Sequence, residues 1–337
     1  MKINYFVGID ISKTSFDVAL LKEDRPEVFT HQKFDNTPNG YKQLQAWLKK
    51  QKVSLSEAFL VMEHTGWYTL ELCCFLQDKK LDFVLLSPLH LKRSLGLVRG
   101  KNDKVDAKRI AYYAFLHRHE LKPIQLPSAC LLKLKNLFAF RDRLIKSQAS
   151  LKQTIKDLKD TNHLVDSKFI IKQSEKQLKF IEQQVKQTEE QITNTLQEDE
   201  TVQANFKLLC SIPGIGLITA VALVLCTNNF TAFDDSRKFA SYCGVAPFEH
   251  SSGTSIKGKT KTSPLANKRI KTLLSNCAST AIQFDEEMKN YYQRKIKEGK
   301  PKMVVINAVR AKLINRIFAT INRGTEYVVL KQYDKAA

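Results

Sequence analysis

The sequence predicts an α/β domain at the N-terminus, then two long helices, then a mostly helical C-terminal domain. Three observations support this. Before residue 125, short apolar runs rich in β-branched and aromatic residues alternate with amphipathic stretches. Leucines then recur every seven residues from position 137. Beyond residue 200 the apolar stretches are long enough for helices. We therefore expect three parts, spanning residues 1–125, 126–200 and 201–337.

The composition points to a polyanionic partner. The chain has 337 residues, 43% of them hydrophobic, which can fill more than one core. Its 54 Lys and Arg against 34 Asp and Glu give a formal charge of +20, which favours nucleic acid over a neutral metabolite. No stretch approaches the ~20 apolar residues of a spanning helix, and no signal peptide opens the chain. We expect a soluble, cytoplasmic protein with no membrane partner.

Cysteine and histidine give no sign of a disulfide framework or a zinc site. The seven cysteines contain no C-x-x-C pair, and most lie among apolar neighbours. We expect them to be reduced core residues. The seven histidines show no zinc-ligand spacing.

The N-terminal region alternates strands and helices. Apolar runs at residues 4–10 and 15–21 predict a β-hairpin, and residues 28–34 a third strand. A turn at 36–40 precedes an amphipathic helix at 41–50. The remaining expected elements are a strand at 58–63, a helix at 67–76, a strand at 83–86 and a helix at 103–117.

Carboxylates stand where two strands end and where the last helix begins. Asp10 and Glu63 close their strands, and Asp103 and Asp106 lie three apart after Asn102, a predicted N-cap. Acids that gather repel one another unless a divalent cation such as Mg²⁺ is bound. We expect all four to converge. Taken singly, Asp10 is equally well a turn residue, and the helical pair is equally well solvated and favoured by the helix dipole.

Two periodic runs occupy the middle of the chain. Leu137, Leu144, Leu151, Leu158 and Val165 form a heptad seam, and a second run uses Leu178, Ile181, Val185, Ile192 and Leu196. Two long helices joined by a polar bend form either an antiparallel hairpin within the chain or an arm that dimerises. Heptads alone do not distinguish these two arrangements.

Two segments of the C-terminal region suit phosphate contacts. Gly214 and Gly216 separate two apolar helices, and glycines followed by a helix N-terminus let backbone N–H groups approach a phosphate. A plain turn between helices is the alternative. Residues 248–259 are polar, cationic and glycine-containing, which suits a loop held against phosphates. A final amphipathic helix is expected at 300–322.

Several motifs together resemble one family. G-I-D-I-S-K at 8–13, M-E-H-T-G-W-Y at 62–68 and K-N-D-K-V-D-A at 101–107 resemble the DEDD motif of insertion-sequence transposases. These are bridge-RNA-guided recombinases, which include pilin-gene invertases. The resemblance implies an RNase H-like, RuvC-like N-terminal domain whose catalytic acids Asp10, Glu63, Asp103 and Asp106 hold Mg²⁺ or Mn²⁺.

The C-terminal region continues the resemblance. Residues 208–220 resemble a helix-hairpin-helix element, and Ser251-Ser252-Gly253 resembles the family's serine motif, which implies that Ser252 is the nucleophile. Residues 269–274 resemble the family's basic helix. Residues 263–267 (SPLAN) depart from the Ser-Lys-x-Gly turn of many relatives, which leaves the contacts there open.

The resemblance implies a recombinase that exchanges strands between donor and target DNA through a phosphoserine. A bridge RNA encoded by the element would guide a homo-oligomer, dimer or tetramer, in a bacterial or archaeal cytoplasm, associated with the nucleoid when bound. The general base for the serine stays open. The expected nucleic-acid contacts are Lys13, Arg99, Lys101, Lys104, Gly214, Gly216, Lys257, Lys259, Lys261 and Arg269.

Three other functions fit parts of the sequence. A RuvC-like nuclease would hydrolyse DNA with metal-activated water and use Ser252 only as a phosphate contact. A non-catalytic, basic nucleic-acid-binding protein would carry the same acids as structural residues. An actin-like sugar kinase fits Gly8-Ile9-Asp10 but lacks a second glycine-rich phosphate loop.

Overall fold

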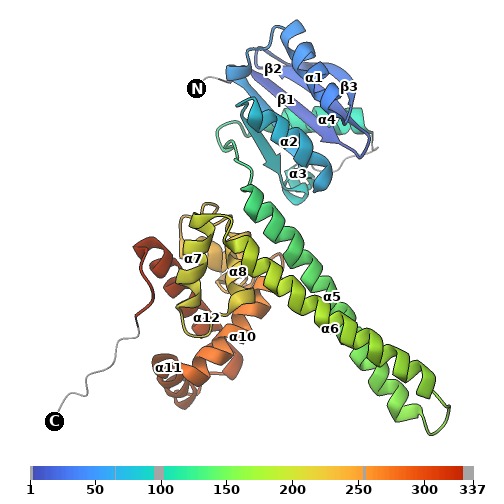
Figure 1. Cartoon of the computed structure of the whole chain (residues 1–337). Helices are drawn as coiled ribbons and strands as arrows, with labels where there is room; N and C mark the ends of the chain where they lie inside the picture. The colour runs from blue at the N-terminus through green and yellow to red at the C-terminus, as the bar shows by residue number, and fades with distance from the viewer. Residues whose placement is uncertain (1–2, 65, 95–101, 253–255, 329–337) are drawn as a thin grey trace. The chain divides into compact units, whose positions relative to one another are not determined.

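The chain divides into two compact units, residues 1–126 and 127–337 (Figure 1). The computed structural model describes residues 3–64, 66–94, 102–252 and 256–328. The predicted middle part, 126–200, lies in the second unit together with 201–337.

A five-stranded mixed sheet forms the centre of the first unit. In the order β3-β2-β1-β4-β5, its strands are β1 (Tyr5–Ile11), β2 (Ser15–Lys22), β3 (Arg25–Asp35), β4 (Ala58–Glu63) and β5 (Phe83–Leu86). The first three strands form an antiparallel meander, while β4 runs parallel to β1 and β5 parallel to β4. This order and these directions are those of an RNase H-like sheet. The predicted α/β domain is therefore confirmed.

Helices cover both faces of this sheet. Helices α1 (Pro38–Lys50) and α2 (Trp67–Asp78) pack on the face that carries Val7 and Ile9. Helix α4 (Asp103–Leu116) packs on the opposite face, with Phe6 and Val61 (Figure 1). The remaining helices are a 3-10 turn, η1 (Leu55–Glu57), and α3 (Pro88–Ser94), which the sequence analysis missed.

The start of α1 corrects one expectation. We predicted a turn at 36–40, but the helix already begins at Pro38. The side chain of Thr37 accepts a hydrogen bond from the Gly40 backbone N–H (3.3 Å) and caps the helix. Proline suits the first helical position because its φ angle is already helical and it has no N–H to leave unpaired.

Helix α4 lies unusually close to β1. A Cβ atom on Gly8 would lie 2.2 Å from the Ala107 carbonyl oxygen and 2.3 Å from the Ala111 nitrogen. Glycine is therefore required at position 8 by the backbone of α4. Ala107 and Ala111, both fully buried, keep the facing side of the helix equally small.

Helices α5 (Ala129–Thr161) and α6 (Lys168–Leu196) form an antiparallel hairpin within the chain. Cross-helix ion pairs show the register: Arg141 pairs with Glu189 (2.6 Å) and Lys159 with Glu175 (2.7 Å). Leu144 of the predicted seam is buried. Val165 lies beyond the end of α5 and is exposed, so it is not part of the seam.

The rest of the second unit is mainly helical. Its elements are α7 (Glu200–Cys210), α8 (Leu217–Cys226), α9 (Ser236–Tyr242), β6 (Pro247–Ser252), β7 (Ile256–Thr262), α10 (Lys268–Phe284), α11 (Glu286–Lys297) and α12 (Lys302–Arg323). One core joins Leu134 and Ile192, at the base of the α5–α6 hairpin, to Leu223, Leu274 and Ile317. Because this core is shared, the hairpin and the C-terminal helices form one unit.

Residues 248–259 are not the loop that we expected. Strands β6 and β7 pair antiparallel across most of this segment. Lysines at 257, 259 and 261 alternate with Gly258, Thr260 and Thr262, a period of two that suits a strand. The high content of lysine and glycine concealed this alternation. Helix α11 was also missed.

Cysteine placement partly agrees with expectation. All seven cysteines are free, but only Cys73, Cys130, Cys243 and Cys277 are buried, while Cys74 and Cys210 are exposed. Across the described part of the chain, no helix combines the length and the apolar character that a bilayer span needs.

Replacing Gly8 with alanine should loosen the first unit. The added methyl group overlaps the backbone of α4, and overpacking of this kind costs about 1–3 kcal/mol or more. Amide hydrogen exchange in α4 measures the effect. Gly216→Ala is the matched control, because a Cβ there meets nothing within 4 Å. Equal protection of α4 in both variants would contradict this account of Gly8.

Candidate active site

A row of charged residues crosses the sheet at the carboxyl end of β1. Asp10 pairs with Asp17 of β2, and Asp17 with Lys33 of β3. On the other side of β1, Ile9 pairs with Met62, which puts Glu63 level with Asp10. Paired residues project to one face of a sheet, and residues two apart along a strand share a face. Asp10 therefore lies on the same face as Gly8, the face that α4 covers.

The first turn of α4 supplies the other two acids. Asn102 caps this helix, as predicted, because its side chain accepts a hydrogen bond from the Lys104 backbone N–H (3.0 Å). Asp103 is exposed and Asp106 is half-buried. The Asp106 carboxylate accepts a hydrogen bond from Arg109 at 2.6 Å.

Asp10 feels the charges of the other three predicted acids. The pKa of Asp10 is raised from 3.8 to about 6, mainly because burial disfavours the charged form. The negative charges of Asp103, Asp106 and Glu63 raise it further, in that order. The charges of Glu63, Asp103 and Asp106 are therefore felt at Asp10, and their convergence on one metal site stays a prediction.

Asp17 is an acid of this row that the sequence analysis missed. It is buried on β2 and adds a small further rise to the pKa of Asp10. The Nε2 atom of His31 lies 2.6 Å from its carboxylate, and the Lys33 ammonium lies 3.6 Å away. The signal was present in the sequence, because an acid in the middle of an apolar strand must find partners on folding.

The donor set suits a divalent cation. Carboxylate oxygens are the ligands that Mg²⁺ and Mn²⁺ prefer, and a cation would relieve the repulsion that raises the pKa of Asp10. Within the described residues, no three Asp, Glu, His or Cys side chains already lie close enough to share an ion. Binding would therefore require side-chain rotation, and Asp106 would exchange Arg109 for the ion.

Two predicted nucleic-acid contacts belong to this end of the first unit. Lys13 is exposed in the turn that follows β1, and Lys104 is exposed in the first turn of α4. Arg99 and Lys101 lie outside the described residues.

Ser252 is the last residue of β6, and its backbone pairs with Ile256. The side chains of Ser251, Ser252, Lys257 and Lys259 lie outside the described part of the structure, as does Gly253. Lys261 is exposed and pairs with Phe248 across the β6–β7 hairpin.

Three other predicted contacts in the second unit have different surroundings. Gly214 adopts a φ of +93°, and a Cβ there would lie 2.8 Å from the Cys277 carbonyl oxygen. Gly214 thus has a structural role in packing against α10. Gly216 caps α8 and is exposed. Arg269 pairs with Asp142 and lies 4.1 Å from the centre of the Phe138 ring, so it joins α10 to α5.

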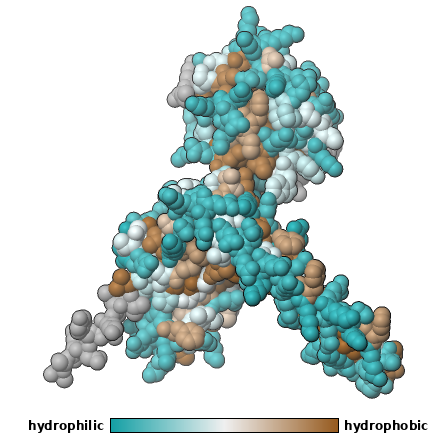
Figure 2. Space-filling view, viewed as in Figure 1, coloured by the Kyte–Doolittle hydropathy of each residue, from teal (hydrophilic) through white to brown (hydrophobic). Residues whose placement is uncertain are grey.

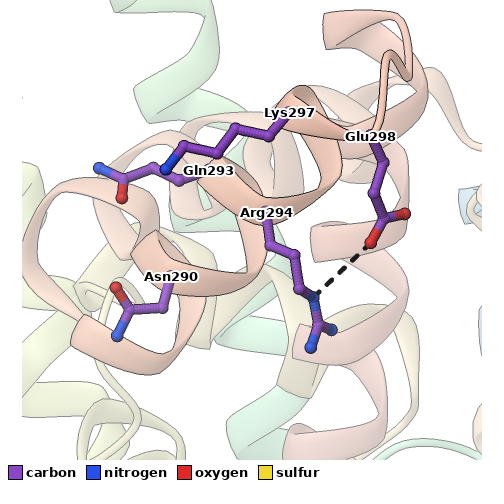
Figure 3. A pocket seen from close by; sticks show the side chains of 5 residues that line it. All are labelled: Asn290, Gln293, Arg294, Lys297 and Glu298. Carbon is purple, nitrogen blue, oxygen red and sulfur yellow. Dashed lines mark ion pairs between the residues drawn. The ribbon is translucent and has the colours of Figure 1, made fainter.

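The surface of the second unit has hollows at two places of interest. One, of about 460 Å³, is formed by α11 and its C-cap (Figure 3). It is polar, and the guanidinium of Arg294 is turned to Glu298 at 3.9 Å. The other, of about 340 Å³, lies at the base of the β6–β7 hairpin; we call it the aromatic hollow. Its lining residues are Ser241, Tyr242, Phe248, Ser263, Leu265 and Ala266.

The raised pKa of Asp10 predicts a pH-dependent stability. Well below pH 3.8 the carboxyl group is protonated in both folded and unfolded chains, and at pH 3.8 it is half ionised in the unfolded chain. From there to about pH 6 the folded chain holds the proton more tightly, so stability falls as pH rises. Asp10→Asn should therefore stabilise the first unit at pH 7 without divalent ions, by about 1–2 kcal/mol for a half-buried, partly screened group.

Thermal unfolding at about pH 2.5 and at pH 7 measures this effect, and the gain should disappear at the lower pH, which lies below both pKa values. Asp24→Asn, in the exposed β2–β3 turn, is the matched control. An Asp10→Asn variant less stable than the unmodified chain at pH 7 would show that the acids do not repel one another as described.

Comparisons with known proteins agree with the motifs. The pilin gene-inverting protein of Moraxella bovis is 25% identical over 327 residues, which cover 96% of this chain and 97% of that protein. The transposase of insertion sequence element IS1111A from Coxiella burnetii is 24% identical, over 84% of this chain and 79% of the relative. RuvC from Thermus thermophilus, in complex with a Holliday junction substrate, matches 36% of this chain and 99% of its own, at 12% identity and a TM-score of 0.29.

Two family models also match the chain, and between them they include the acidic residues and the serine motif. A DEDD transposase model of the IS110 type matches residues 7–163. A model described as transposase IS116/IS110/IS902 family matches residues 206–293. The chain therefore belongs to the insertion-sequence DEDD transposases and is a DNA-recombining enzyme.

Proposed function

We propose that this transposase joins donor and target DNA by strand exchange that depends on Mg²⁺ or Mn²⁺, with Ser252 as the nucleophile. The observation that carries the proposal is the raised pKa of Asp10, which is caused first by burial and then by the charges of Asp103, Asp106 and Glu63. Placing a partly buried carboxyl group near three other acids is costly for folding, and metal binding would explain why it is present. The support for Ser252 is its place in the S-S-G motif.

The chemistry divides between the bound ion and the chain. A cation held by the four carboxylates would polarise a phosphate and stabilise the charge on the attacking and leaving oxygens. The Ser252 hydroxyl attacks the phosphorus of one strand and gives up its proton, a phosphoserine bond forms, and the DNA oxygen that leaves takes up a proton. A hydroxyl group of the second DNA then attacks the phosphoserine and restores Ser252. Each step replaces one phosphate ester with another, so no ATP is needed.

Cations on both units are expected to hold the nucleic acids. Lys13 and Lys104 in the first unit and Lys261 in the second are exposed, within a chain of formal charge +20. We infer contacts to both DNA partners and to a guide RNA encoded by the element. The enzyme would act in the cytoplasm of a bacterial or archaeal cell, on the nucleoid.

We further propose that the chain works as a homo-oligomer. Leu144 of the heptad seam is buried within the α5–α6 hairpin. The far end of the hairpin, in contrast, exposes large apolar side chains (Figure 2). These are Leu164, Val165, Phe169 and Ile170. Apolar side chains grouped in this way favour contact with another protein surface. The mass in solution of the chain, compared with that of Phe169→Lys, tests whether a second copy covers this end.

Removing any one carboxylate charge should stop strand exchange. Asp10→Asn, Glu63→Gln, Asp103→Asn and Asp106→Asn each keep the side-chain volume and delete one anionic ligand, so we expect at least a hundredfold loss of product. Binding of Mn²⁺, followed by its paramagnetic signal, should weaken in parallel, while Asp24→Asn changes neither. Near-normal exchange by three of the four variants would overturn the metal site.

The two neighbouring serines provide a direct test of the nucleophile. Adjacent side chains in a strand project to opposite faces, so only one of them can face the phosphate. Ser252→Ala should abolish a covalent protein–DNA adduct trapped in denaturant, whereas Ser251→Ala should retain it. Peptide mapping locates the adduct. Cleavage of DNA without any adduct would instead favour hydrolysis by water, as in a nuclease.

A further inference from the structure

The aromatic hollow exposes more apolar surface than its polar surroundings require. It lies between the end of α9, the beginning of β6 and the segment that connects β7 to α10. Three of its lining side chains are large and open to solvent: Tyr242 is 39% exposed, Phe248 49% and Leu265 57%. Exposed apolar groups that share one concave site mark a binding surface more often than isolated ones do.

The Tyr242 ring is fixed in place. Asn267 donates a hydrogen bond from Nδ2 to the tyrosine oxygen (2.9 Å), and the Asn267 backbone N–H donates to the Tyr242 carbonyl (2.9 Å). The ring also packs against Phe233, with centroids 5.2 Å apart, and Phe233 packs against the fully buried Phe239. The hollow therefore has a rigid aromatic wall that loses little entropy when a ligand stacks on it.

Positive charge lies beside this wall. Phe248 and Lys261 are paired across the β6–β7 hairpin, so their side chains project to the same face. Lys271, at the start of α10, donates a hydrogen bond to the Thr262 hydroxyl (3.1 Å). Glu249 adds one negative charge, at a β-bulge next to Phe248. An aromatic wall next to lysines is the combination that single-stranded nucleic acid needs, a stacking platform with cations for its backbone.

We propose that the aromatic hollow binds an unpaired nucleobase of the DNA strand, stacked between Tyr242 and Phe248, with Lys261 on an adjoining phosphate. Its volume of about 340 Å³ lies in the range of small-ligand sites, roughly 300–1,000 Å³. The hydroxyl groups of Ser241 and Ser263 also line it and can meet the polar edge of a base. Only a base outside the duplex stack can enter a concave site of this kind.

The choice of DNA rests on the proposed function. Ser252 is the last residue of β6 and Phe248 is its second residue, so a DNA strand presented to Ser252 along this hairpin passes the hollow. A base held there would fix the register of the strand relative to the nucleophile. The hollow would thus act in positioning the DNA, separately from the chemistry at the acids.

Binding of a single-stranded DNA oligonucleotide to the full chain tests the inference. Phe248→Ala should weaken binding about tenfold with no change in the slope of log affinity against log salt, because stacking releases no counterions. Lys261→Ala should reduce that slope by about 0.7. Phe284→Ala is the matched control, since this ring is 78% exposed at the end of α10 and lines no part of the hollow, and it should change neither quantity.

Photocrosslinking with 5-iodouracil in the same oligonucleotide should modify Tyr242 or Phe248. Equal affinities of Phe248→Ala and Phe284→Ala, or a crosslink elsewhere, would overturn the inference. A loss confined to an RNA oligonucleotide of the same sequence would overturn the assignment to DNA. If Phe248→Ala behaves as the unmodified chain while the Ser252 adduct still forms, only the hollow is misassigned. If the unmodified chain forms no adduct, the proposed function fails instead.

Discussion

The close contact between α4 and β1 is the constraint on which the first unit depends. Gly8 leaves room for the backbone of α4, and Ala107 and Ala111 keep the facing side of the helix small. Because α4 packs directly against β1, the first turn of this helix lies near the carboxyl end of the strand. Burial raises the pKa of Asp10, and the charges of Asp103 and Asp106 then add to this rise. A larger residue at position 8 would change the packing and the electrostatics together.

Several acids lie near the carboxyl end of β1, and other parts of the fold limit what their repulsion costs. Burial and four negative neighbours oppose the charge on Asp10, so this part of the fold is strained without a cation. Local partners limit the cost: Arg109 pairs with Asp106, and His31 and Lys33 hold Asp17. Stability lost at a functional site is offset by the apolar cores on both faces of the sheet.

The second unit is organised by a different interaction, the shared core at the base of the α5–α6 hairpin. Leu134 and Ile192 pack with the C-terminal helices, while Arg269 reaches from α10 to Asp142 and Phe138 on α5. This core anchors one end of the hairpin and leaves the other end to solvent. It also supports the β6–β7 hairpin through α9 and α10, and Ser251 and Ser252 lie in the first strand of that hairpin.

The sequence by itself determined the α/β domain, its hairpin and meander, the cap at Asn102 and the four acids. These features depend on local patterns: apolar periodicity, capping chemistry and carboxylates at strand ends. Tertiary structure alone decided that the heptad seam packs within the chain, because a heptad does not identify its partner. It also decided the roles of Gly214 and Arg269 and the aromatic hollow. Each of these depends on a contact between residues far apart in the chain, and no local pattern encodes such a contact.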